Sequence, residues 1–508
     1  MREYTQSEQP VVYQIYVRSF ADANGDGIGD LEGIRTHLWH VDKLGADGVW
    51  ITPFYRSPQH DAGYDISDHT DVDPLFGDLA DFERLVTDAH AQGLMVFVDI
   101  VPNHVSSEHP WFQALLAGDS QTQAYFHVLP GRGADGGQPP NNWVSMFGGP
   151  AWSQLPDGRW YLHLFDSSQP DLDWTNPAVR AEFERILTTW ADRGADGFRI
   201  DVAAGLIKDP AYPDYGTTVA HPHWGRPEVH QIYRQWDAIL HRDDRSSYVV
   251  AEVWGSPEEV MAYAGPGELD SAFAFPWLAS EFDAASLQGI AEEWLAAADT
   301  CDAVPSWVLG SHDFIRPVTR YGGGELGWRR ARAMALVTFA LPGAVYIHQG
   351  EELGLPEVEV PAEARQDPTF HRTDGEQLGR DGVRVPLPWA ADEPHYGFSA
   401  AGSDAPWLPQ PPAWRELAVD AQWRDSASTL ALYRAAIALR RTLLLPASRA
   451  VTWLDLGEGI LAFRRAGVLV CLNTSGAAIP MPPGRLLLTS SPFPSGTLPA
   501  NSAVWILE

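Results

Sequence analysis

Cysteine is almost absent from the chain: its 508 residues include two, Cys301 and Cys471. Cysteines so few and so far apart cannot form a disulfide framework, and they lack the paired spacing of a thiolate zinc site. The sequence also contains no run of about 18 apolar residues, which a membrane-spanning helix requires. The N-terminal residues, MREYTQSEQP, have no apolar segment typical of a secretion signal. We therefore expect a cytoplasmic protein with no membrane association.

Positive charge is scarce relative to negative charge. The chain has 35 Lys and Arg against 67 Asp and Glu, which gives a formal net charge of −32 at pH 7. Such a chain would repel nucleic acid and anionic lipid, so its ligand is expected to be neutral. The surplus of negative charge is typical of a solvated surface that keeps a protein soluble.

Aromatic residues are abundant, with 21 Trp and 16 Tyr. Their rings suit the apolar faces of sugars, although most aromatic residues of a protein simply form its core.

The chain alternates short apolar segments with stretches of helical periodicity, a pattern typical of repeated βα units. The candidate strands are residues 11–17, 47–52, 94–100, 197–203, 247–254, 271–275, 306–310 and 344–350. Eight strands that alternate with helices favour an α/β fold with a closed (β/α)8 TIM barrel. A doubly wound open sheet is the alternative architecture.

Helix signals fall between the candidate strands. Asn176 and Pro177 suit the N-cap and first position of a helix whose apolar residues recur until Gly194. Residues 79–93 and 427–443 show the same periodicity. The second of these stretches is placed to close the barrel.

Three segments depart from this rhythm. Residues 105–170 are too long for a βα loop and are rich in Gly, Pro and Trp, which indicates a small inserted domain after the third strand. Residues 351–425 form a Pro-rich excursion after the eighth strand. Short alternating segments predict a C-terminal antiparallel β-sandwich domain over residues 446–508. The barrel is thus expected to comprise residues 1–104 and 171–445.

Acidic residues follow the candidate strands at the end where a TIM barrel places its active site. Asp99, Asp201, Glu252 and Asp313 lie at or just after the C-terminal ends of four of them. A single carboxylate at a strand end more often caps a helix or joins a salt bridge, but four such positions are difficult to explain in that way. Glycosidic bond cleavage requires two carboxyl groups beside the bond, one protonated and one ionised. Carboxylates that converge raise one another's pKa values, which helps to keep one of them protonated near neutral pH.

Seven motifs stand in a fixed order along the chain: DANGDGIGDLEGI (22–34), DAGYDISDH (61–69), DIVPNH (99–104), QPDLDW (169–174), GFRIDVA (197–203), EVW (252–254) and SHD (311–313). In sequence and order they resemble glycoside hydrolase family 13, the α-amylase family, and in particular its α-glucosidase and oligo-1,6-glucosidase branch. The resemblance extends from about residue 11 to the C-terminus. It implies hydrolysis of α-glucosides on a (β/α)8 barrel.

The resemblance assigns a role to each acidic residue of these motifs. Asp201 would be the nucleophile that forms a glucosyl-enzyme, Glu252 the acid that later acts as base, and Asp313 the group that holds hydroxyls of the distorted ring. The supporting residues it implies are Arg199 beside the nucleophile, His104 and His312 on the same glucose, Tyr64 as an aromatic platform and Asp99 behind the site. Asp61 and Arg384, the latter in RDGVRVPLPW, resemble a pair that grips the non-reducing end. Such a pair would close the pocket and make the enzyme exo-acting.

Segment 22–30 spaces oxygen ligands at alternating positions. Asp22, Asn24, Asp26 and Asp30, together with the Ile28 carbonyl, are able to wrap one hard cation, and the intervening glycines permit the tight turn. The pattern is similar to an EF-hand loop without its distal Glu. The alternative is an Asx-rich turn that binds no metal. The family resemblance implies a structural Ca²⁺ or Mg²⁺ at this position and no organic cofactor.

The resemblance also bears on the reaction and the substrate. Gln169 stands where some isomerising relatives carry Met, which favours hydrolysis. Val202 follows the nucleophile, as in α-1,6-preferring members, whereas segments 206–216 and 221–234 are more similar to maltase-type enzymes. We therefore expect a retaining, exo-acting α-glucosidase for maltose and short maltooligosaccharides, with α-1,6 linkages as further candidates. Its partner is expected to be a small oligosaccharide and not nucleic acid, and the protein a monomer or weak homo-oligomer.

Other functions remain open from the sequence. An oligo-1,6-glucosidase, or a transglucosylase or isomerase of the trehalose-synthase or sucrose-isomerase type, would use the same covalent intermediate with another linkage or a sugar acceptor. A non-catalytic binding relative would carry a membrane span and altered carboxylates, and the sequence shows neither. A metal-dependent barrel hydrolase would need histidine pairs at strand ends; HPH at 221–223 has that spacing but follows a Pro- and Gly-rich loop and is interpreted as structural.

Overall fold

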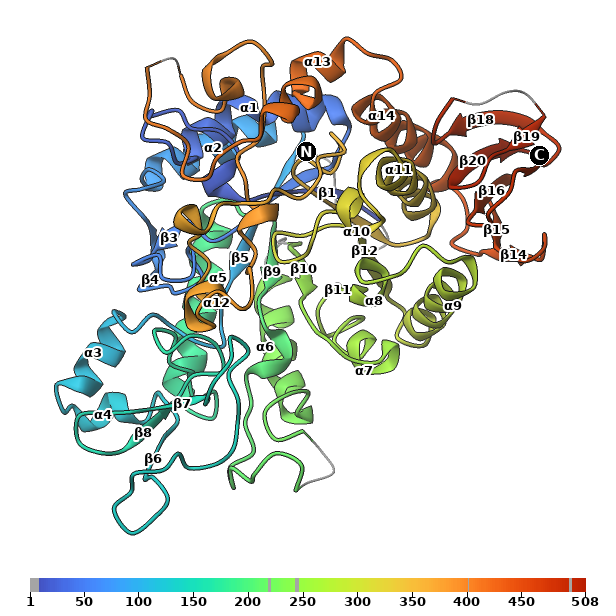
Figure 1. Cartoon of the computed structure of the whole chain (residues 1–508). Helices are drawn as coiled ribbons and strands as arrows, with labels where there is room; N and C mark the ends of the chain where they lie inside the picture. The colour runs from blue at the N-terminus through green and yellow to red at the C-terminus, as the bar shows by residue number, and fades with distance from the viewer. Residues whose placement is uncertain (1–8, 218–220, 243–245, 401, 493–495) are drawn as a thin grey trace.

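Eight parallel strands form a closed barrel in the computed structural model, which describes residues 9–217, 221–242, 246–400, 402–492 and 496–508 (Figure 1). The strands are β1 (Val11–Ile15), β2 (Gly48–Ile51), β5 (Met95–Ile100), β9 (Gly197–Ile200), β10 (Tyr248–Ala251), β11 (Ser271–Phe273), β12 (Val304–Val308) and β13 (Ala344–His348). Their order around the barrel is β1-β13-β12-β11-β10-β9-β5-β2, and β1 closes it by pairing with both β13 and β2. The predicted TIM barrel is confirmed, and the open doubly wound sheet is excluded.

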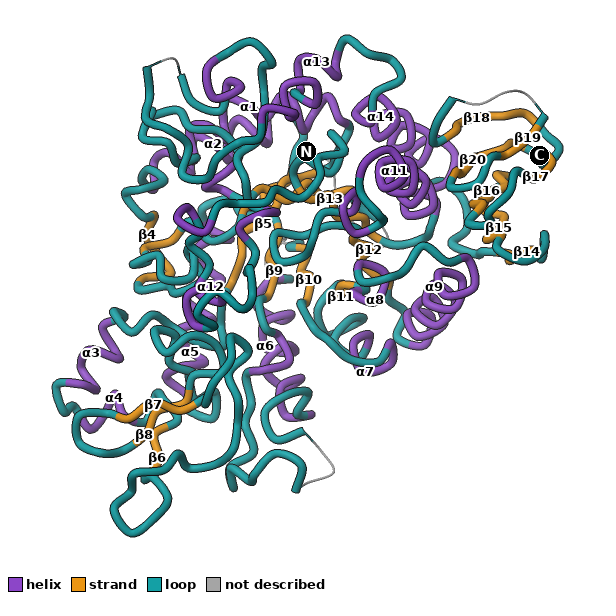
Figure 2. Tube along the Cα trace, viewed as in Figure 1, coloured by secondary structure: helices purple, strands orange, loops and turns teal. Residues whose placement is uncertain are grey.

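A helix follows each strand and packs outside the barrel, as the purple and orange segments of Figure 2 show. These helices are α1 (Leu31–Leu44), α2 (Leu79–Ala91), α5 (Pro177–Asp192), α6 (His230–Leu240), α7 (Pro257–Met261), α9 (Ala284–Thr300), α11 (Gly324–Ala340) and α14 (Thr429–Leu439). The shorter α8 (Phe275–Leu278) and α10 (Pro317–Arg320) precede α9 and α11. α5 begins as predicted, because the Asn176 side chain accepts a hydrogen bond from Ala178 N at 2.9 Å and Pro177 takes the first position. Within the described ranges, no helix is both long and apolar enough to cross a bilayer.

Side chains fill the interior of the barrel. Val12, Trp50 and Tyr346 belong to one buried cluster, whereas Val11 and Tyr13 of the same strand β1 join the larger core shared with the helices. Successive side chains of a β-strand point to opposite faces of the sheet, so those of β1 alternate between the barrel interior and the helices. Because the interior is packed, the functional site is confined to the end of the barrel where the strands finish.

At the C-terminal end of the barrel, two strands are shorter than the apolar pattern predicts. β9 stops at Ile200 and β10 at Ala251, although the apolar segments continue to residues 203 and 254. The next residues, Asp201 and Glu252, leave the ladder and carry their side chains out of the barrel wall. The mismatch in strand length therefore coincides with the candidate site.

The inserted residues 105–170 form a small unit at the lower left of Figure 1. The unit contains α3 (Pro110–Leu116), α4 (Ser120–Gln123) and a sheet in the order β6 (Val128–Leu129), β8 (Trp160–Leu162), β7 (Trp152–Gln154). Its own core gathers Trp143, Ala151, Trp152, Leu162 and Leu164. A separate antiparallel pair, β3 (Tyr55–Arg56) and β4 (Asp68–Val72), follows β2.

Residues 351–425 contain only two short α-helices in their described part, α12 (Pro368–Arg372) and α13 (Val419–Trp423). The C-terminal unit is a sheet in the order β14 (Thr452–Leu454), β15 (Ile460–Arg465), β16 (Val468–Asn473), β20 (Ser502–Leu507), β18 (Arg485–Thr489). One face of this sheet packs on α11, where Trp505 Nε1 donates to Leu336 O at 3.0 Å. The pair β17 (Ile479–Pro480) and β19 (Thr497–Leu498) packs on the other face. The predicted C-terminal antiparallel β-domain is confirmed.

Candidate active site

A single arginine gathers three carboxylates at the C-terminal end of the barrel. Arg199 of β9 pairs with Asp99 of β5 in the parallel ladder, and its Nη1 lies 2.8 Å from Asp99 Oδ1. The same nitrogen lies 2.5 Å from Asp201 Oδ1, and Nη2 lies 2.5 Å from Glu252 Oε2. Because β5, β9 and β10 are neighbours, their ends bring the three acids together. Asp201 and Glu252 are thereby fixed side by side on one guanidinium.

Three carboxyls face one positive charge here, and this imbalance affects their protonation. Burial, together with Glu252 and Asp99, raises the pKa of Asp201 well above its usual range, against the opposing effect of Arg199. Burial also raises the pKa of Asp99 to about 6, although Arg199 counteracts it. Asp201 and Asp99 are therefore harder to ionise than ordinary aspartates.

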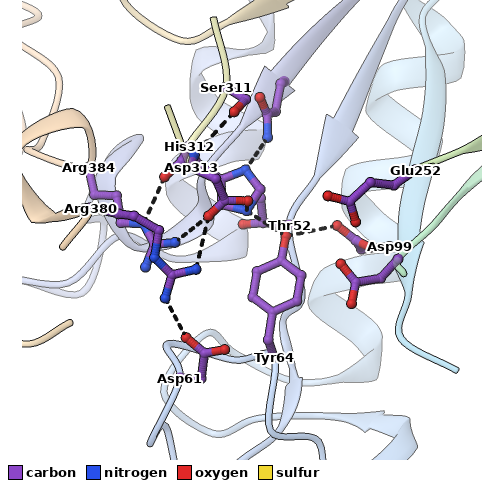
Figure 3. Close-up of polar contacts among 12 residues, drawn as sticks. Thr52, Asp61, Tyr64, Asp99, Glu252, Ser311, His312, Asp313, Arg380 and Arg384 are labelled. Carbon is purple, nitrogen blue, oxygen red and sulfur yellow. Dashed lines mark hydrogen bonds and ion pairs between the residues drawn. The ribbon is translucent and has the colours of Figure 1, made fainter. Parts of the chain in front are cut away.

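Asp313, on the loop after β12, has the opposite electrostatic setting. Its Oδ1 accepts hydrogen bonds from Arg384 Nη2 at 2.7 Å and from Arg380 Nη1 at 3.1 Å, and its Oδ2 lies 3.2 Å from His312 Nε2 (Figure 3). Burial alone would raise the pKa of Asp313, but His312, Arg380 and Arg384 hold it well below the usual range. Burial thus disfavours ionisation of Asp201 on one wall of the site, whereas Asp313 on the other wall stays ionised.

Tyr64 lies between these two walls, as Figure 3 shows. Its Oη donates to Asp99 Oδ2 at 3.1 Å and lies 2.8 Å from His312 Nε2, and the Tyr64 and His312 rings stack with centroids 5.4 Å apart. His104 Nε2 lies 3.2 Å from the Tyr64 carbonyl oxygen. Burial lowers the pKa of His312 to about 3 and that of His104 to about 4. Both histidines are therefore neutral hydrogen-bonding groups at physiological pH.

The predicted pairing of Asp61 with Arg384 is wrong, because Arg380 occupies that position. Arg380 Nη2 donates to Asp61 Oδ1 at 2.8 Å, and its Nε donates to Asp367 Oδ2 at 2.6 Å. Arg384 is buried instead behind Asp313, where its Nε also donates to the His312 carbonyl at 2.9 Å. The 3-10 turn at 381–383 separates the two arginines, so that Arg380 faces the cavity and Arg384 turns toward the barrel.

The three predicted catalytic carboxylates open into one cavity of about 420 Å³. Asp61, Tyr64, His104 and Arg380 line it as well, and Arg199, His312 and Asp99 lie behind this lining.

The apolar lining of the cavity includes Met146, Phe147, Phe165, Val202, Trp224, Val253 and Trp254. Met146 and Trp254 are 62% and 58% exposed and form the apolar rim of the cavity. Trp254 stacks on Phe275 with centroids 4.4 Å apart. The cavity thus has a charged inner end and an apolar rim.

Three further residues contribute to the site although the sequence did not predict them to do so: Arg380, Lys208 and His221. Lys208 Nζ lies 2.8 Å from Asp171 Oδ2 and donates to Asn103 Oδ1 at 2.7 Å, and this buried network holds the segment that carries His104. His221, interpreted above as structural, lines the cavity. The sequence offered one signal for a role of Lys208 at the site, because Lys208 is the only Lys or Arg between residues 200 and 225.

The 22–30 loop folds around its own acidic side chains. Asp22 accepts hydrogen bonds from Gly25 N at 2.6 Å and Gly27 N at 2.9 Å, and Asp26 Oδ1 accepts one from Ile28 N at 2.9 Å. Each of these oxygens keeps a second lone pair, so the donor set suits a hard cation. Within the described part of the chain, no group of three or more His, Cys, Asp or Glu side chains is arranged to hold a metal ion. An ion here would therefore also need the Asn24 amide and the Ile28 carbonyl.

Comparison with known proteins finds similar chains over most of the sequence. The family model "Alpha amylase, catalytic domain" matches residues 14–445. A probable alpha-glucosidase of Rhizobium meliloti (strain 1021) is 36% identical over 486 residues, which cover 90% of this chain and 86% of that protein. An oligo-1,6-glucosidase of Parageobacillus thermoglucosidasius is 34% identical, over 85% of this chain and 83% of that protein. The crystal structure of an alpha-glucosyl transfer enzyme matches with a TM-score of 0.91 at 34% identity, over 99% of both chains.

Proposed function

Because the chain belongs to the alpha-amylase family of glycoside hydrolases, we propose that it is a retaining, exo-acting α-glucosidase. It releases α-glucose from the non-reducing end of maltose and short maltooligosaccharides, with α-1,6-linked glucosides as further substrates. The observation that carries this proposal is the pair of Asp201 and Glu252. Both are bound by Arg199 and open into the cavity.

In the first step an Asp201 oxygen forms a bond with C1 of the terminal glucose. As the C1–oxygen bond breaks, its electron pair leaves with the aglycone, and Glu252 gives that oxygen a proton. In the second step Glu252 takes a proton from water, and the water oxygen attacks C1 and releases Asp201. Two inversions at C1 restore the α configuration. Arg199, 2.5 Å from Asp201, supports the ionised nucleophile.

The closeness of the two carboxyls supports retention. An inverting enzyme places a water between its carboxyls and separates them by about 6.5–9.5 Å. Asp201 Oδ1 and Glu252 Oε2 each lie 2.5 Å from a nitrogen of the same Arg199 guanidinium, which supports the shorter separation of about 5–5.5 Å typical of retaining enzymes. A glucose bound between Tyr64 and the ionised Asp313 would place C1 beside Asp201 and its hydroxyls on Asp313.

Ion pairs at the inner end of the cavity support an exo action. Arg380 links Asp61 to Asp367 and also contacts Asp313. Arg372 of α12 binds the inserted unit, because its Nη1 donates to Asp166 Oδ2 at 2.9 Å and its Nη2 donates to Gly148 O at 2.8 Å. These contacts tie Asp61, Asp313 and the inserted unit together at the inner end of the cavity, which supports a terminal glucose as the unit that binds there.

A transglucosylase is the second candidate function, and the apolar rim favours it. The rim offers a stacking surface for a sugar acceptor in place of water, and the alpha-glucosyl transfer enzyme has a closely similar fold. Both candidates share the covalent glucosyl-Asp201 intermediate. They differ in what enters the site after the aglycone leaves.

Product analysis distinguishes the two candidates. With separate solutions of maltose, isomaltose, sucrose and trehalose, we expect free glucose as the main product from maltose, and a slower release from isomaltose. Early products are separated by anion-exchange chromatography. If maltose or sucrose is converted mainly into another disaccharide with little free glucose, the hydrolase proposal is replaced by the transferase or isomerase.

We also propose that the 22–30 loop binds one Ca²⁺ or Mg²⁺ through Asp22, Asn24, Asp26, Asp30 and the Ile28 carbonyl. The ion would brace the loop between β1 and α1, which packs against Ala405 and hydrogen-bonds to Phe398 of the 351–425 excursion. Removal of the ion by a chelator is expected to lower the melting temperature by several degrees, because a ligand bound only to the folded state stabilises it.

The matched control for this prediction is Asp26→Ala. Asp26 is exposed and its side chain bonds only within the loop, so the substitution should remove the response to chelator without unfolding the barrel. Melting curves are recorded with and without chelator, and bound metal is counted by elemental analysis. Identical curves for the unmodified protein and the absence of a bound divalent ion would exclude the site.

A further inference from the structure

The residue after the nucleophile has an unusual backbone conformation. Val202 has φ 48° and ψ 41°, the left-handed region that β-branched residues rarely adopt. Its neighbours hold it there: Ala203 N donates to the Glu252 carbonyl at 3.0 Å, and Gly205 N donates to the Val202 carbonyl at 2.9 Å. A side chain at Gly205 would collide with Val202 Cγ1, so the turn also depends on that glycine.

The N–H of Val202 points at the candidate acid. Val202 N donates to Glu252 Oε2 at 3.1 Å, and the same oxygen lies 2.5 Å from Arg199 Nη2. A carboxyl oxygen has two lone pairs, and Oε2 uses both. The acid proton must then be carried by the other oxygen, Oε1. Glu252 lines the cavity whereas Arg199 is buried behind it, so the arrangement turns Oε1 toward the substrate.

We propose that the backbone N–H of Val202 is a positioning group for the acid: it fixes the Glu252 carboxyl with Oε1 as the oxygen that donates and accepts the catalytic proton. The inference rests on the proposed function, because it presupposes that Glu252 protonates the leaving group. The left-handed turn at Val202 brings the next N–H, that of Ala203, to the Glu252 carbonyl, so two successive amides bind the same residue.

The test replaces Val202 with its α-hydroxy analogue, which turns one amide into an ester and removes only the N–H. For maltose, whose leaving group needs protonation, we expect kcat/KM to fall about ten-fold, a fraction of the usual contribution of general acid catalysis. For α-glucosyl fluoride, whose leaving group needs little protonation, we expect a change of less than about two-fold. A purely structural role would lower both values together.

The matched control is the same ester replacement at Ala203, whose N–H bonds to the Glu252 main chain in the same turn. It should lower the melting temperature as much as the Val202 ester while leaving the ratio of the two substrates unchanged. Equal losses on both substrates for the Val202 ester, or no loss on either, would overturn the positioning role. Failure of the unmodified protein to hydrolyse either substrate would overturn the proposed function and this inference with it.

Discussion

Replacing Asp201 with asparagine is expected to reduce kcat on maltose by about 10⁴-fold or more, because an amide oxygen cannot form the glucosyl ester on which both steps depend. Asparagine preserves the shape of the side chain and can still accept the hydrogen bond from Arg199. The loss therefore measures the missing nucleophile. Asp209→Asn is the matched control, since Asp209 lies in the same loop outside the cavity and should keep activity within about two-fold.

The stability of the Asp201→Asn variant gives a second readout. Burial raises the pKa of Asp201 in the folded protein, so ionising this group costs the folded state more than the unfolded one. That cost is absent at low pH and appears as the pH rises past the unfolded pKa. The variant should therefore melt at the same or a higher temperature than the wild type, with a larger gain at pH 8 than at pH 4. Near-normal turnover by the variant would contradict the role of Asp201.

Glu252→Ala is expected to lower kcat/KM for maltose by about 10³-fold, because the leaving oxygen and the attacking water both lose their proton-transfer partner. With α-glucosyl fluoride the first step should remain fast, since fluoride leaves without a proton. Azide should then accelerate turnover and yield α-glucosyl azide, because this anion needs no general base.

The control for the second prediction is Glu258→Ala, an exposed glutamate on α7 that should behave as the wild type. Initial rates are measured on both substrates with and without azide. A Glu252→Ala variant that loses maltose and α-glucosyl fluoride activity equally and gains nothing from azide would show that Glu252 is not the acid. In that case the pair with Asp201 would have another division of roles.

The barrel is predictable from the sequence because each of its eight units repeats the same local signals. The strands are short apolar runs, and helices such as α5 carry both a cap and an apolar face. The ends of the strands are less predictable. Val202 and Ala203 continue the apolar pattern of β9 beyond Asp201, yet Val202 adopts a left-handed conformation. The hydrogen bonds of the folded site outweigh its local preference for a strand.

The inner end of the cavity shows why some contacts escaped prediction. Asp61 and Arg380 are separated by 319 positions in the sequence. No local pattern predicts which of the two arginines in RDGVR will pair with Asp61. The resemblance pointed to Arg384, but the direction of each side chain depends on the turn at 381–383 and on the space behind Asp313. The order of the motifs identified the candidate catalytic acids and placed Arg199 beside Asp201; only the folded chain shows that Asp99 and Glu252 bind the same guanidinium.

The most direct test of retention is the anomer of the glucose first released from maltose. Proton NMR spectra recorded in the first minutes, before mutarotation is complete, resolve the α- and β-anomers of the product. Two successive displacements, by Asp201 and then by water, predict that α-glucose appears first and β-glucose only as mutarotation proceeds. If β-glucose appears first, a single displacement operates and Asp201 is not a covalent nucleophile.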